Sequence, residues 1–106
     1  MQITKQRLTA AIKAARFPGN LGEMMEEELQ RNLGFLNFFW NMTPSATIGI
    51  WLSLGLVCIA DASLSDEQIF EALFRLVSAL FDDFEEYAVA KQAVLEMKRR
   101  FDREAA

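Results

Sequence analysis

The chain has 106 residues, of which 52% are hydrophobic, and its formal net charge is −4. This length is typical of one domain, and so large an apolar fraction excludes an intrinsically disordered chain. Histidine is absent and Cys58 is the one cysteine, which excludes an internal disulfide, a multi-cysteine zinc site and Ser–His or Cys–His catalysis. The five glycines form no phosphate-binding loop. We therefore expect one domain over residues 1–106 that is not an enzyme and uses no cofactor and no metal.

The N-terminal segment is basic but does not resemble a secretory signal. No apolar stretch of useful length follows the basic residues within the first 30 positions. A single cysteine is compatible with a reducing compartment. We expect a cytoplasmic protein.

The first predicted helix covers about residues 5–16. Thr4 can cap its N-terminus, apolar residues recur three and four apart along it, and a proline–glycine pair follows it. A second helix is predicted over about residues 21–41, because Asn20 and Glu23 have the spacing of a capping box.

A third helix is predicted over about residues 44–60. Thr43 can serve as its N-cap and Pro44 as its first helical residue, where proline's missing N–H is not needed. This helix is apolar all round, which is typical of the buried centre of a domain. Small residues recur along it every four positions and would let a neighbouring helix approach closely: Ser45, Gly49 and Ser53.

The third predicted helix lies in a run without charged residues that extends from position 32 to position 60. A membrane span needs about 20 apolar residues, but the helix start at Thr43 divides this run, and the upstream half contains three asparagines. A soluble core is therefore the favoured interpretation. A membrane-associated small helical protein is the disfavoured alternative.

A fourth helix is predicted from Ser65, which forms a second capping-box pattern with Gln68. A fifth is predicted from about Asp83 almost to the end of the chain. No glycine or proline separates these two segments, so one long bent helix remains an alternative. No alternating strand pattern is present. The sequence predicts an all-α, single-domain helical bundle of about five helices with an apolar helix at its centre.

The end of the second predicted helix is the candidate contact surface. Phe35 and Phe38 fall outside the apolar face that the other residues of this helix share, so either a neighbouring helix or a partner protein must cover them. Acidic residues earlier in the helix could steer a basic partner. The candidate protein-binding residues are Phe35, Phe38, Phe39, Trp40, Glu23, Glu27 and Glu28.

These patterns predict a non-catalytic protein-binding module, acting as a small acidic inhibitor, adaptor or assembly factor. The expected partner is another protein with a basic patch, and a homodimer is also compatible with the pattern. The alternative is a nucleic-acid-associated regulator, which the acidic overall charge disfavours. It would use a basic strip formed by the two terminal helices lying side by side, with its candidate residues in the last helix: Lys98, Arg99, Arg100 and Arg103.

Charge is unevenly distributed along the chain. The first 20 residues carry only basic charges, residues 21–90 are strongly acidic, and the last 16 are again basic. The simplest interpretation is that basic terminal helices lie beside acidic middle helices and pair with them.

Overall fold

The computed structural model describes residues 3–59 and 64–105, and the side chains of residues 102–105 are outside this description. The described residues form six α-helices and no strand. Their bounds are α1 Lys5–Ala15, α2 Leu21–Arg31, α3 Leu33–Phe39, α4 Pro44–Ile59, α5 Asp66–Leu80 and α6 Phe84–Ala105. The all-α prediction is confirmed. The count is six rather than five because the segment predicted as one helix over 21–41 is divided at Asn32.

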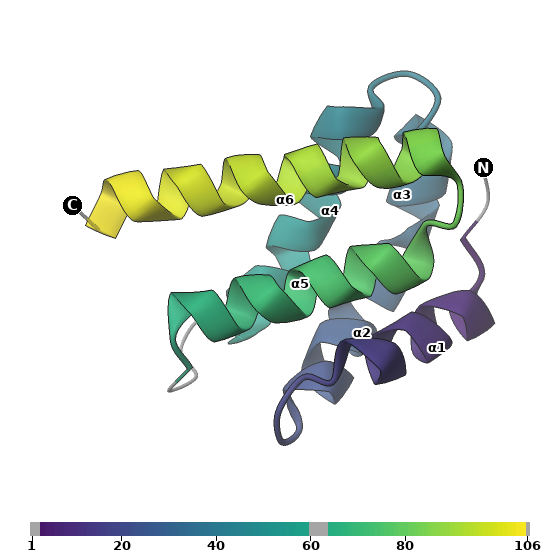
Figure 1. The fold of residues 1–106 in the computed structure, drawn as a ribbon. Helices are drawn as coiled ribbons and strands as arrows, with labels where there is room; N and C mark the ends of the chain where they lie inside the picture. The colour runs from purple at the N-terminus through teal and green to yellow at the C-terminus, as the bar shows by residue number, and fades with distance from the viewer. Residues whose placement is uncertain (1–2, 60–63, 106) are drawn as a thin grey trace.

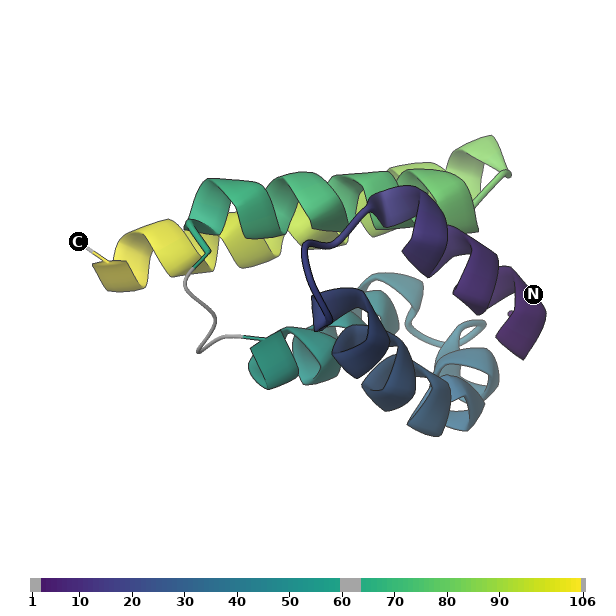
Figure 2. The same cartoon turned by 90° about the horizontal axis from the view of Figure 1, so that it is seen from below.

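The helices lie in two layers (Figure 1 and Figure 2). α5 packs between α1 and α6 in one layer, and α4 packs against α2 and α3 in the other. Contacts of α1 with α2 and of α4 with α6 join the layers. The Cα radius of gyration is 12.8 Å, which is that of a compact chain of this length.

Five helix starts are predicted from the sequence, and a side-chain cap is present at three of them. The Thr4 hydroxyl accepts a hydrogen bond from the Arg7 amide, and Ser65 and Gln68 form the reciprocal capping box. Asp83 Oδ1 accepts from two backbone amides of the first turn of α6. Helices α5 and α6 are therefore separate, which settles the alternative of one bent helix.

The capping box predicted at Asn20 is not formed. Asn20 precedes α2, but its side chain makes no capping hydrogen bond. Its backbone lies at φ −94° and ψ 8°, whereas a residue that caps through its side chain normally has an extended backbone.

The division between α2 and α3 depends on two side chains that reach the last carbonyls of α2. Asn32 Nδ2 donates to the carbonyl oxygen of Glu28 at 2.9 Å. Trp51 Nε1, from α4, donates to the carbonyl oxygen of Leu29 at 3.0 Å. Carbonyls at a helix C-terminus need donors from outside the helix, and here one of the two donors comes from a distant part of the chain.

Only one side of α4 is buried, so the helix is not the fully buried centre of the domain that its apolar composition predicts. Its inner side carries Ile48, Trp51 and Leu52, none of which is exposed to solvent. Its outer side carries Ile50 and Val57, which are 53% and 74% exposed. A helix without charged residues offers no pattern that tells the inner side from the outer one.

The close helix approach occurs at Gly55 instead of along the predicted small residues. A Cβ atom at Gly55 would lie 2.9 Å from Met25 Cε and 3.1 Å from Leu29 Cδ2, whereas one at Gly49 would meet no atom within 4 Å. α2 therefore packs onto the face of α4 that contains Gly55. Gly49 lies on a different, open face.

Candidate protein-binding surface

Aromatic side chains gather at the C-terminal end of α3, as the sequence predicts. Phe38 is 68% exposed and Phe39 is more than a third exposed, while Phe35 is half-buried. The ring centroids of Phe35 and Phe39 are 5.1 Å apart, and those of Phe38 and Phe39 are 4.9 Å apart. These three rings form one exposed aromatic cluster.

Trp40, the fourth predicted aromatic residue, lies in the core. It is 7% exposed, and its ring stacks on that of Phe81 with a centroid separation of 5.4 Å. It is therefore not part of the exposed surface of the chain. Met42, two residues later, is 60% exposed and extends the apolar surface from α3 towards the start of α4. Met42 is not among the residues predicted for this surface.

The predicted acidic residues all lie on α2. Glu23 and Glu27 are exposed, and Glu28 is half-buried. Arg31 forms ion pairs with both Glu27 and Glu28. Part of the expected negative charge is therefore neutralised within the helix, while Glu23 has no ion pair among the described residues.

The outer side of α4 adds a second exposed apolar region, which the sequence did not predict. It carries Ile50, Leu54 and Val57, three and four residues apart, and all three are exposed. Their spacing places them on one side of the helix. The same spacing is present in the sequence. However, apolar residues occur on every side of α4, so the spacing alone does not identify the exposed side.

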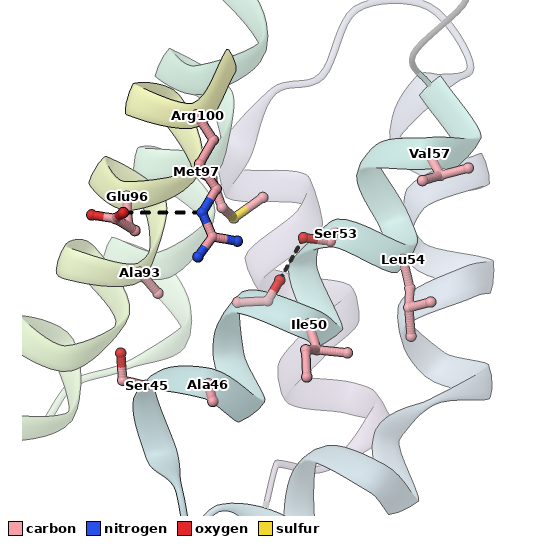
Figure 3. Close-up of a pocket in the computed structure, with 11 residues that line it drawn as sticks. Ser45, Ala46, Ile50, Ser53, Leu54, Val57, Ala93, Glu96, Met97 and Arg100 are labelled. Carbon is pink, nitrogen blue, oxygen red and sulfur yellow. Dashed lines mark hydrogen bonds and ion pairs between the residues drawn. The ribbon is translucent and has the colours of Figure 1, made fainter. Parts of the chain in front are cut away.

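A groove of about 690 Å³ lies between α4 and α6 (Figure 3), and Ile50, Leu54 and Val57 are among the residues that line it. Gly49 and Ser53 line it from α4, and Met97 lines it from α6. Glu96 and Arg100 lie at the α6 side, with 4.0 Å between Glu96 Oε1 and Arg100 Nε. The groove is therefore lined largely by apolar and small side chains, and its charges occur as an opposite pair.

The predicted basic strip is not formed. α1 packs against α5 and α2 and makes no contact with α6, because α5 lies between the two terminal helices (Figure 1). Lys98, Arg99 and Arg100 are exposed near the projecting end of α6, and Arg99 pairs with Glu96 at 3.2 Å. The side chain of Arg103 lies outside the described part of the chain.

Few ion pairs join the basic terminal segments to the acidic middle of the chain. Among the side chains that the structure describes, one ion pair joins different segments, between Arg7 of α1 and Asp82 of the α5–α6 connection, at 3.6 Å. The other pairs each lie within one helix. The predicted complementarity of basic and acidic helices therefore contributes little to the packing of these residues.

The described residues were also compared with the requirements of a metal site and of a membrane-spanning helix. No cluster of three or more Cys, Asp or Glu side chains is placed to hold a metal ion in residues 3–59 and 64–101. No helix in the described segments has both the length and the apolar character needed to cross a membrane.

Comparison with known proteins does not assign the chain to a protein family. The chain matches no protein-family model, and no match to it is found among curated proteins or solved structures.

Proposed function

We propose that the protein is a non-catalytic protein-binding module that acts as an inhibitor, adaptor or assembly factor. Its proposed contact region, the α3–α4 surface, comprises Phe35, Phe38, Phe39, Met42, Ile50, Leu54 and Val57. The observation that carries this proposal is the exposure of large apolar side chains on two consecutive helices that have no charged residue.

Free energy favours covering this surface. Removing a large apolar side chain from water contributes about 1.5–3 kcal/mol. Exposed apolar patches of this kind mark interaction sites in soluble proteins, and aromatic residues and methionine are enriched in protein interfaces while acidic residues are depleted. Phe38, Met42 and Val57, each more than half exposed, supply such side chains.

Electrostatics supports a partner that has a basic patch. Glu23 and Glu27 are exposed on α2, which contacts both α3 and α4. Charges at the rim of an interface mainly raise the association rate. Because Glu27 is paired with Arg31, we assign affinity to the apolar residues and the steering role mainly to Glu23.

The proposal is tested by capturing partners from a lysate of the source cells with the wild-type chain and with Phe38→Asp and Val57→Asp variants. Both residues are exposed, so the variants should fold, which circular dichroism checks. Phe84→Asp is the matched control, because Phe84 is 82% exposed but lies at the start of α6. We expect the two α3–α4 variants to lose a partner that Phe84→Asp retains. Retention of every partner by both variants would contradict the proposal.

The nucleic-acid alternative has the exposed basic end of α6 in its favour. Against it stand the pairing of Arg99 with Glu96 and the separation of α1 from α6. Nuclease treatment of the lysate distinguishes the two functions. If nuclease removes all captured partners, and if a Lys98→Glu/Arg99→Glu variant loses them as well, the nucleic-acid function replaces the one proposed.

A further inference from the structure

We propose that a second copy of this chain covers the outer side of α4, through parallel pairing of the two α4 helices about a two-fold axis. This inference rests on the proposed function, because it identifies what occupies part of the α3–α4 surface. It starts from four residues on the outer side of α4, which are spaced alternately four and three apart: Ala46, Ile50, Ser53 and Val57.

This spacing is that of the contact positions in paired helices. Helices that pair side by side present residues every 3.5 positions, and parallel two-stranded pairs commonly have β-branched residues at the first contact position of each heptad and leucine at the second. Ile50 and Val57 are seven residues apart and β-branched, and both are more than half exposed. Ala46 and Ser53 occupy the alternating contact positions, and small side chains there let two helices approach closely.

The groove beside this face provides space for a side chain of the second copy. Leu54 and Gly49 flank the contact positions on opposite sides, and in a parallel pair such flanking positions of the two helices face each other. A Cβ atom at Gly49 would meet nothing within 4 Å. Leu54 of each copy can therefore lie over Gly49 of the other, within the groove of about 690 Å³. The surface is self-complementary, as a two-fold interface requires.

The charges permit this contact. Each chain has a formal net charge of −4, but α4 has no charged residue, so two α4 helices meet without like charges opposite each other. At the side of the groove, Glu96 and Arg100 lie 4.0 Å apart and leave no excess charge of one sign. This face therefore offers no net charge that a strongly charged partner could bind.

The size of the contact sets the expected strength of the dimer. The 16 residues of α4 span about 24 Å at 1.5 Å per residue, and α6 contributes only one side of the groove. Such a contact belongs to the smaller, transient class of interfaces. We therefore expect a dimer that dissociates on dilution.

Analytical ultracentrifugation over a range of concentrations tests the association. The monomer mass is 12.1 kDa, and we expect the wild-type mass to rise towards twice this value with concentration. Gly49→Leu, which fills the groove, and Val57→Asp, which places a charge on the contact face, should remain monomeric. The matched control Phe84→Asp should still dimerise. A wild-type dimer that persists in both α4 variants would use another face, which would overturn the inference.

Cysteine cross-linking tests the parallel direction. In a Cys58→Ser background, Ala46→Cys and Val57→Cys should each form a disulfide with the same residue of the second copy, while Phe84→Cys should not. A disulfide needs Cα atoms within about 7 Å. Because residues 46 and 57 are separated by about 16 Å of helix, an antiparallel pair could link at most one of these two positions to itself. That result would overturn the parallel arrangement.

The inference and the proposed function can fail separately. A wild-type chain that is monomeric at every concentration overturns the inference. If Val57→Asp nevertheless loses a captured partner, the proposed function stands and a different protein covers α4. If the chain is monomeric and no partner depends on Phe38 or Val57, both proposals are overturned.

Discussion

The indole N–H of Trp51 donates a hydrogen bond to the backbone carbonyl oxygen of Leu29, with 3.0 Å between Nε1 and O. The donor is on α4 and the acceptor is in the last turn of α2. Both residues are fully buried, so this bond is shielded from water. It joins the point where α2 ends to the inner side of α4.

Replacing Trp51 by phenylalanine should lower the free energy of unfolding by about 1–3 kcal/mol, because a buried carbonyl loses its donor. Urea denaturation followed by circular dichroism measures the change. Trp40→Phe is the control: it removes an indole of the same size, for which no hydrogen bond to the described residues is found. If both variants lose equal stability, the hydrogen bond contributes nothing beyond packing.

Two glycines in α4 should respond oppositely to alanine. Gly49→Ala should raise stability by about 0.5–1 kcal/mol, because alanine favours the helix and the site is open. Gly55→Ala should lower stability, because the added methyl group would lie 3.1 Å from Leu29 Cδ2 and 3.2 Å from Leu29 Cγ in a fully buried side chain, and overpacking costs about 1–3 kcal/mol. Thermal unfolding at low protein concentration, where the chain is monomeric, measures both. A stabilising Gly55→Ala would mean that α2 can move away from α4 at little cost.

The two capping-box patterns of the sequence should differ in energy. Ser65→Ala should lower stability by about 1 kcal/mol, because it removes the hydroxyl that accepts from the Gln68 amide. Asn20→Ala should have a smaller effect, because the Asn20 side chain makes no capping bond. Chemical denaturation of both variants provides the comparison, and equal losses would contradict it.

The segment before α1 is held by Asn37. The Asn37 carboxamide accepts from the Ile3 amide at 2.8 Å and donates to the Ile3 carbonyl oxygen at 3.1 Å. Asn37→Ala should remove both bonds and accelerate hydrogen exchange at the Ile3 amide, measured by NMR. Asn37→Asp, which can still accept but not donate, should have an intermediate effect. Asn41→Ala is the control, since Asn41 is exposed, and it should leave exchange at Ile3 unchanged.

The candidate surface was partly predictable. The exposure of Phe38 follows from its helical spacing, which places it outside the apolar face of this segment. Phe39 shares that apolar face and is nevertheless more than a third exposed. Trp40 lies on the same face, but its stacking on Phe81 brings together residues 41 positions apart. Local sequence does not contain that information.

The sequence by itself determined the helical content and most helix boundaries of this protein, because caps, turns and spacing act over four or five residues. Thr4, Ser65 and Asp83 each mark a helix start through hydrogen bonds to their immediate neighbours, and Pro44 marks one because its missing N–H is not needed at the first helical position. Tertiary structure alone decided which side of α4 faces solvent. It also decided that Trp51 supplies the hydrogen-bond donor for the Leu29 carbonyl at the end of α2. A helix that is apolar all round has no local preference for one buried side. The choice is made by long-range packing: Gly55 admits α2 on one side, and Ile50 and Val57 remain exposed on the other.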